Sequence, residues 1–188
     1  RSEGSSSFFN EFKISSKSFY QINPVQTKKL YEAAINSAKL TKNDIILDAY
    51  SGVGTIGICA SPNVSKVISV ELEKSAHMDA IINAKLNNIK NVHFYNDDAT
   101  RFINNLAVKK EKIDVVIMDP PRKGSDASFL KAVIKLNPRK VIYISCDPHT
   151  QINDLKYLTN DYKITYIQPV DMFPQTEHIE NIVTLERR

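Results

Sequence analysis

The chain has 188 residues, a formal net charge of +4, 42% hydrophobic residues and 24% charged residues. This balance is that of an ordinary globular domain, and it excludes disordered, collagen-like and coiled-coil chains. A single domain is expected, because a chain of about 150 residues already buries about 70% of the surface that it exposes when unfolded.

The two cysteines, Cys59 and Cys146, lie far apart and form no CxxC pair. A disulfide framework and a four-ligand zinc or iron–sulfur site are therefore excluded, and no metal site is expected. The longest apolar stretches have about six residues where a membrane span needs roughly 20, and RSEGSSS is no signal peptide, so we expect a cytoplasmic protein without a membrane partner. Short basic clusters such as Arg139-Lys140 are expected on the solvated surface, so a nucleic-acid partner has to be argued from chemistry.

The Ser-rich start of the chain precedes the first expected element. Residues 1–12 are expected to be mobile, and 13–188 to form the domain. The stretch PVQTKKLYEAAINSAKL (24–40) spaces its apolar residues as a helix does, with Asn23 as the N-cap and Pro24 in the first turn.

From there, short β-branched runs alternate with helical segments. Strands are expected at 44–50, 66–72, 91–97, 112–119, 140–146, 162–171 and 178–187. Helices are expected at 55–60, 74–88, 98–107, 125–136 and 149–158. The first five strands are almost continuously apolar, as parallel strands covered on both faces require, and the last two follow each other too closely for a helix and should pair as an antiparallel hairpin at one end of the sheet. This doubly wound α/β pattern with an antiparallel last strand resembles the Rossmann-like, seven-stranded fold of class I S-adenosylmethionine-dependent methyltransferases.

A glycine-rich turn follows the first strand. It reads Asp48-Ala49-Tyr50-Ser51-Gly52-Val53-Gly54-Thr55-Ile56-Gly57. The GxGxxG pattern, with Glu71 at the end of the second strand to bind a ribose diol, fits both a dinucleotide and S-adenosylmethionine. Asp48 favours S-adenosylmethionine, because a carboxylate suits the cofactor's charged amino group and would repel a pyrophosphate. Asp98, after the third strand, fits either a contact to adenine or a helix N-cap.

Two further strands end in chemically active residues. The fourth ends in Asp119-Pro120-Pro121-Arg122-Lys123-Gly124 and the fifth in Ser145-Cys146-Asp147-Pro148. Because parallel strands end at one edge of the sheet, Asp119 and Cys146 should face a common cleft beside the glycine turn. A lone cysteine is usually a small buried core residue, and we expect this for Cys59.

The motifs DPPRKG, SCDP and FPQTEHIE, in this order behind DAYSGVGT, resemble those of the RNA 5-methyluridine methyltransferase family. The segment Phe19-Tyr20-Gln21-Ile22-Asn23 resembles the family's FxQxN signature, and the resemblance runs from about residue 13 to residue 188. It implies S-adenosylmethionine as cofactor and methylation of carbon 5 of a uridine in structured RNA, 23S ribosomal RNA in preference to transfer RNA.

The resemblance also implies a role for each site residue. Cys146 is the nucleophile that adds to carbon 6 of the uracil, and its place at a strand end beside Arg122 should help to form the thiolate. Glu180, and not Glu177, removes the carbon 5 proton; without the resemblance it would be only an exposed acid at the start of a strand. Asp119 binds the target base, and Gln21 and Arg122 position the uracil. The cofactor would contact Gln21, Asp48, Tyr50, Gly52, Gly54, Thr55, Glu71, Asp98 and Asp119.

The chain departs from the family pattern in three respects. Asp147 stands where members commonly have Asn, and its charge would oppose the thiolate unless it points away or caps the next helix. Ser51 replaces a common Cys, an exchange without consequence for size. The additional RNA-binding domain of full-length members is expected to lie outside this catalytic domain. Three alternatives stay open: methylation of another acceptor, a nicotinamide-dependent oxidoreductase that uses GxGxxG, and a fragment that retains only cofactor binding.

Overall fold

The structure is a computed structural model that describes residues 23–176 and 178–188. The helices are α1 (Pro24–Ala38), α2 (Thr55–Ala60), α3 (Lys74–Leu86), α4 (Ala99–Lys109), α5 (Ala127–Leu136) and α6 (Pro148–Leu158), with a 3-10 turn over Ser61–Asn63. The strands are β1 (Ile45–Ala49), β2 (Lys66–Glu71), β3 (Val92–Asn96), β4 (Val115–Met118), β5 (Lys140–Ser145), β6 (Tyr162–Val170) and β7 (Glu180–Arg187). Every expected helix and strand is present, with small shifts at the ends.

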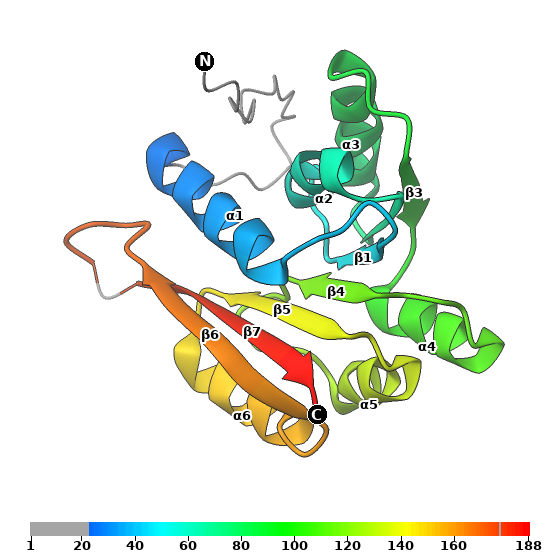
Figure 1. Ribbon diagram of the computed structural model, residues 1–188. Helices are drawn as coiled ribbons and strands as arrows, with labels where there is room; N and C mark the ends of the chain where they lie inside the picture. The colour runs from blue at the N-terminus through cyan, green and yellow to red at the C-terminus, as the bar shows by residue number, and fades with distance from the viewer. Residues whose placement is uncertain (1–22, 177) are drawn as a thin grey trace, which may run out of the picture.

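The seven strands form one sheet in the order β3-β2-β1-β4-β5-β7-β6 (Figure 1). The first five strands are parallel, and β7 runs antiparallel to both of its neighbours, β5 and β6. The expected doubly wound sheet with an antiparallel hairpin at one end is therefore confirmed. The sheet order adds that the last strand lies inside the sheet, while β6 forms its edge.

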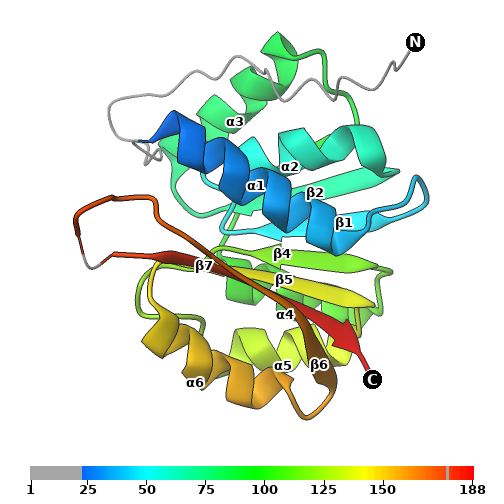
Figure 2. The same cartoon turned by 60° about the vertical axis from the view of Figure 1, so that its left-hand side comes forward.

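Helices cover both faces of the sheet: α1, α2 and α3 lie on one face and α4, α5 and α6 on the other (Figure 2). Successive residues of the central strands alternate between the two cores. Ile46 packs beneath α1 and α2, and Leu47 packs against the core of α4 and α5. This double burial explains why the central strands are continuously apolar.

Side-chain caps start the helices where the sequence predicts them. Asn23 Oδ1 accepts a hydrogen bond from Gln26 N at 3.2 Å, and Pro24 is the first residue of α1. Asp98 and Asp126 cap α4 and α5 in the same way. Because each of these caps satisfies a free amide of the first turn, the helices begin at fixed points close to the strand ends.

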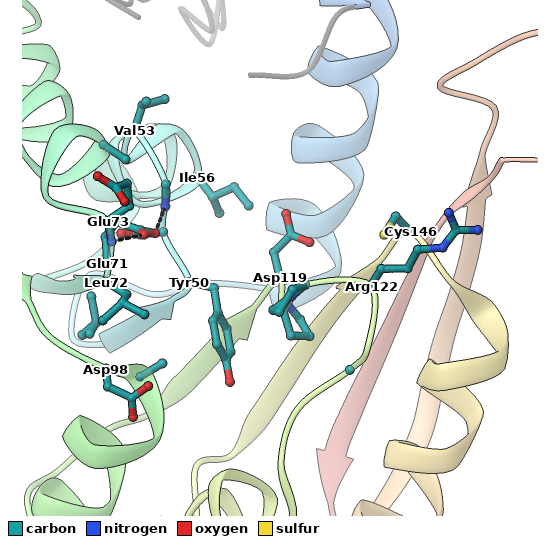
Figure 3. A pocket seen from close by; sticks show the side chains of 18 of the residues that line it. Tyr50, Val53, Ile56, Glu71, Leu72, Glu73, Asp98, Asp119, Arg122 and Cys146 are labelled. Atoms are coloured by element: carbon teal, nitrogen blue, oxygen red, sulfur yellow. Dashed lines mark hydrogen bonds between the residues drawn. The ribbon is translucent and has the colours of Figure 1, made fainter. Parts of the chain in front are cut away.

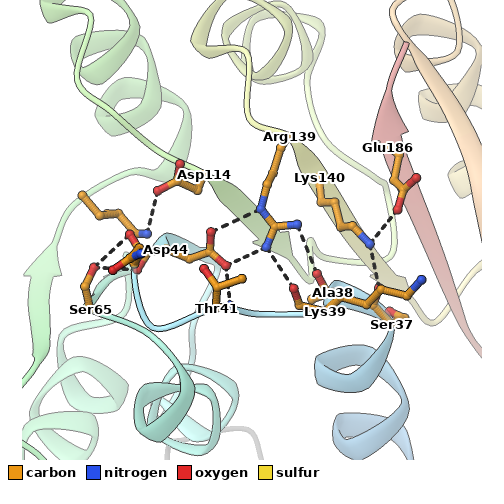
Figure 4. A network of polar contacts seen from close by, with 12 residues as sticks. Ser37, Ala38, Lys39, Thr41, Asp44, Ser65, Asp114, Arg139, Lys140 and Glu186 are labelled. Carbon is orange, nitrogen blue, oxygen red and sulfur yellow. Dashed lines mark hydrogen bonds and ion pairs between the residues drawn. The ribbon is translucent and has the colours of Figure 1, made fainter.

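Ion pairs fasten the amino-terminal edge of the sheet (Figure 4). Arg139 donates to both carboxylate oxygens of Asp44, at 2.6 and 3.2 Å, and to the carbonyls of Ala38 and Lys39 at the end of α1. Lys140 is 5% exposed, and its Nζ lies 2.7 Å from Oε1 of Glu186 on β7. The expectation that this basic pair belongs to the solvated surface is therefore wrong, because both side chains hold secondary-structure elements together.

No helix in the described part of the chain is both long enough and apolar enough to cross a bilayer.

Candidate active site

A cavity of about 690 Å³ opens at the carboxyl ends of the parallel strands, between the strand-end loops and the start of β7 (Figure 3). Ligands of doubly wound folds bind at this edge. The predicted site residues that line it are Tyr50, Gly52, Thr55, Glu71, Asp98, Asp119, Arg122, Cys146 and Glu180. The glycine turn and the cysteine, nearly a hundred positions apart in the sequence, therefore share one cavity.

The glycines of the turn have different physical roles. Gly52 and Gly54 both have positive φ, 55° and 81°, which an L-residue with a side chain rarely adopts. A Cβ on Gly54 would lie 3.0 Å from the Cβ of Ala80 on α3, so this glycine lets α3 pack against the turn. No described atom lies within 4 Å of a Cβ on Gly52, which faces the cavity. Of these two glycines, Gly52 is therefore the one at which a ligand can come close to the turn.

Glu71, at the tip of β2, holds the turn in place. One of its carboxylate oxygens accepts from Gly52 N at 2.8 Å and the other from Glu73 N at 2.7 Å. A carboxylate can accept about four hydrogen bonds, so capacity remains for a ligand in the cavity. Glu71 thus shapes the turn and also presents an acceptor beside it.

Asp48 lies behind the glycine turn instead of in the cavity wall. Its side chain is 2% exposed and accepts from Gly57 N at 3.1 Å. Burial raises the pKa of Asp48 to about 7, partly offset by the Gly57 amide, and the charge of Glu71 raises it further. Gly57 is required here, because its Cβ would lie 2.7 Å from Asp48 Oδ2. Asp48 therefore supports the turn from behind, and its direct contact with a ligand stays a prediction.

Strand register brings Cys146 and Glu180 together. The antiparallel ladder between β5 and β7 ends with the pair Ser145 and Asn181. Cys146 is the first residue after β5 and Glu180 is the first residue of β7, so the register continued by one position brings Cys146 opposite Glu180, and both residues line the cavity. Glu180 is only 4% exposed, so it is not the exposed acid that its sequence position alone would indicate.

The thiol lies in a more acidic environment than its sequence neighbours suggest. Burial raises the pKa of Cys146, and the charges of Glu180 and Asp119 raise it further. Arg122 lowers this pKa, as predicted, but its effect is smaller than those of burial and the two carboxylates. These surroundings therefore favour the protonated thiol over the thiolate.

Asp119, between Tyr50 and Cys146 in Figure 3, provides the second carboxyl group of this wall. Burial raises the pKa of Asp119 well above its usual range, and the charges of Glu180 and Asp48 raise it further. Like charges held together in a poorly solvated site cannot all ionise. The surroundings of Asp119 therefore favour its protonated form, which can donate a hydrogen bond.

The loop between β4 and α5 presents Arg122 at the rim. Arg122 Nε lies 3.5 Å from Asp147 Oδ2, and Thr150 Oγ1 donates to the Arg122 carbonyl at 3.0 Å. Asp147 caps α6 by accepting from His149 N at 2.9 Å and from Thr150 N at 3.3 Å. These backbone hydrogen bonds, together with Arg122, lower the pKa of Asp147. The residue that departs from the family pattern is thus a helix cap, as one of the two predicted arrangements requires.

Of the remaining predicted site residues, Asp98 lines the cavity and Gln21 is not described by the structure. Asp98 both caps α4, through Arg101 N at 2.8 Å, and lines the cavity, so the two roles predicted for it are compatible. Gln21 lies outside the described residues.

Sequence reasoning missed Leu72, which is 68% exposed in the cavity wall. Its position directly after Glu71, the acidic end of β2, is the sequence feature that could have identified it. Among residues 23–176 and 178–188, no cluster of three or more His, Cys, Asp or Glu side chains is arranged to hold a metal ion.

The chain is similar to known RNA-modifying proteins over almost its whole length. The sequence model of the tRNA (uracil-5-)-methyltransferase family matches residues 7–188. An uncharacterized RNA methyltransferase of Streptococcus mutans is 46% identical over 177 residues, and one of Caldanaerobacter subterraneus is 44% identical over the same length. Each match covers 94% of this chain and 39% of the relative, so the chain spans about two fifths of these proteins.

Solved structures agree with this similarity. The Pyrococcus abyssi tRNA (uracil-54, C5)-methyltransferase, in complex with S-adenosyl-L-homocysteine, superposes with a TM-score of 0.78 and 33% identity. The match covers 93% of this chain and 41% of that one. A putative S-adenosylmethionine-dependent methyltransferase of Streptococcus mutans, with a TM-score of 0.72 and 14% identity, shares the fold alone.

Proposed function

Because the chain belongs to the tRNA (uracil-5-)-methyltransferase family, we propose that it is the catalytic domain of an enzyme that methylates carbon 5 of a uridine in RNA, with S-adenosylmethionine as the methyl donor. The observation that carries the proposal is the placement of Cys146 opposite Glu180, in the cavity that the glycine turn also lines. A nucleophile, a base and a nucleoside-binding turn are the three parts that this reaction needs.

The cavity residues fit S-adenosylmethionine. Gly52 leaves space in the cavity where a side chain would stand, Glu71 retains acceptor capacity for a ribose diol, and Leu72 presents an apolar surface for a base. Tyr50 and Asp98 would complete this end of the site. When bound, S-adenosylmethionine supplies an electrophilic methyl group.

The side chains at the other end of the cavity would prepare the uracil and restore it. The Cys146 thiol would first lose its proton to solvent, and the thiolate would then add to carbon 6, while the electron pair of the C5–C6 double bond moves into an enolate that spans carbon 5 and O4. Asp119, whose protonated form is favoured by its burial, would donate a hydrogen bond to the enolate oxygen. After carbon 5 is methylated, Glu180 takes its proton, the C5–C6 double bond re-forms and the Sγ–C6 bond breaks.

The substrate would be a uridine that is flipped out of structured RNA, because carbon 6 must reach Cys146. Arg122, exposed at the rim, would contact the backbone or base of the flipped nucleotide. Mapping of 5-methyluridine in cells that lack the protein separates the two RNA classes: loss from 23S ribosomal RNA identifies one substrate and loss from transfer RNA the other. Retention of every 5-methyluridine would contradict the proposal.

The covalent step gives the direct test. RNA that contains 5-fluorouridine should be trapped on the full-length protein in the presence of S-adenosylmethionine, because fluorine cannot leave as a proton. Cys146→Ala should abolish this adduct, and Cys59→Ala, which alters the other cysteine, should leave it intact. Calorimetry should detect binding of S-adenosylhomocysteine to the protein and no binding of NAD. An adduct on Cys146→Ala, or methylation by that variant, would refute the mechanism.

A further inference from the structure

We propose that Gln151 is a positioning residue that holds Glu180 opposite Cys146 from the other face of the sheet. The inference rests on the proposed function, and it concerns two residues that neither line the cavity nor belong to the motifs discussed above, Gln151 on α6 and Asn181 on β7.

Gln151 joins β5 and β7 where their ladder ends. Its Nε2 donates to the carbonyls of Tyr143 and Asn181, at 3.0 and 3.2 Å, and its Oε1 accepts from Asn181 Nδ2 at 2.7 Å. Gln151 is 1% exposed, so water cannot replace these bonds. Both amide hydrogens and the amide oxygen are thus committed to the two strands that carry the thiol and the base.

The alternation of side chains places this amide pair behind the site. Ile182 packs in the core beneath α1 and α2, so Glu180 points to that face and Asn181 to the opposite face, toward α6. Gln151 therefore hydrogen-bonds Asn181, the residue next to Glu180, without entering the cavity. A side chain that acts in this way can fix the position of the base but cannot react with the substrate.

The start of β7 lies next to the edge strand of the sheet. Glu180 pairs on its outer side with Val170 of β6, the edge strand, where Ile167 is 59% exposed. On its inner side, the last ladder pair is Ser145 and Asn181. Because β7 enters the sheet at this point, the amide pair ties the residue next to Glu180 to α6 and, through the Tyr143 carbonyl, to β5.

The test compares two steps of the reaction in the full-length protein. Gln151→Leu keeps the volume and removes all three hydrogen bonds. Capture of 5-fluorouridine RNA needs the thiol but not proton removal, so it should stay within about twofold of wild type, whereas turnover on uridine RNA should fall about 10- to 100-fold and the methylated adduct should accumulate. Leu158→Ala, a core change on the same helix, should lower both steps equally.

A second measurement needs no RNA. The rate of Cys146 alkylation is followed against pH by peptide mass spectrometry, which separates this thiol from Cys59. The charge of Glu180 raises the pKa of Cys146, and Asp119 and Arg122 are the other charged groups that act on it. The midpoint should shift to lower pH in Gln151→Leu and in Glu180→Gln, and should not shift in Leu158→Ala. Asn181→Ala should add nothing to Gln151→Leu, since the two residues act as a pair.

The two hypotheses fail differently. If wild type gives neither adduct nor turnover, the proposed function is wrong, while the alkylation midpoints still report on the position of Glu180. If wild type is active, and Gln151→Leu keeps both its alkylation midpoint and its ratio of turnover to adduct formation, the positioning role of Gln151 is wrong.

Discussion

Asp48→Asn should gain stability relative to wild type as the pH rises from acid to alkaline values. Burial raises the pKa of Asp48 to about 7, against 3.8 for the ordinary group. The folded state therefore binds this proton more tightly than the unfolded state. The resulting stabilisation is fully present below pH 3.8 and is lost as the pH rises through about 7.

The size of the effect follows from the shift. Three pKa units correspond to about 4 kcal/mol of unfolding free energy between the low-pH and high-pH limits, of which about 3 kcal/mol falls between about pH 5 and about pH 8.5. Asn cannot ionise, so Asp48→Asn does not lose this amount. Its buried amide group costs about 1–3 kcal/mol if it stays unpaired, but that cost does not depend on pH.

The assay is urea unfolding of wild type and Asp48→Asn across this pH range. The difference in unfolding free energy between the two proteins should move in favour of the variant as the pH rises, with most of the change completed near pH 8. A difference that stays constant with pH would refute the reasoning, because it would mean that Asp48 is ionised in the folded protein at every pH tested.

Three further variants test the turn and the sheet edge. Gly57→Ala places a Cβ 2.7 Å from Asp48 Oδ2 and should cost about 1–3 kcal/mol, measured by urea unfolding; wild-type stability would contradict the enclosed position of this carboxylate. Glu71→Gln replaces an acceptor by an amide donor opposite a backbone N–H and should weaken S-adenosylhomocysteine binding about tenfold in calorimetry, so unchanged affinity would count against its role in holding the turn. Arg139→Ala leaves Asp44 buried without its partner and should lower the unfolding free energy by about 2 kcal/mol, with cofactor affinity unchanged because the network lies at the opposite edge of the sheet; a loss of affinity at full stability would be the contrary result.

Local sequence signals were sufficient for most of the fold. The continuously apolar strands predicted the parallel core, and Asn23 predicted the start of α1. The segment between 171 and 178 is too short for a helix, which predicted the terminal hairpin. They could not show that β7 inserts between β5 and β6, because strand order depends on contacts between distant segments. That insertion is what places Glu180 opposite Cys146.

The site residues divide in the same way. Residues at strand ends, such as Asp119 and Cys146, could be assigned to one cleft, since parallel strands end at a common edge. The buried position of Asp48 could not be predicted, because the sequence does not show that α2 covers this carboxylate and donates a hydrogen bond to it from Gly57 N. Arg139 also misled sequence reasoning, since a charge cluster looks the same whether solvent or a buried carboxylate faces it.

The interior position of β7 has a consequence for biosynthesis. A nascent chain that has emerged only as far as β6 leaves one edge of β5 and both edges of β6 unpaired, because β7 (Glu180–Arg187) is the strand that joins them. Translation must deliver that segment before β5 and β6 can be joined, and the same event brings the acid to the sulfur. A chain that stops short of this segment therefore keeps unpaired strand edges that favour aggregation, and Glu180 joins Cys146 only when the sheet is completed.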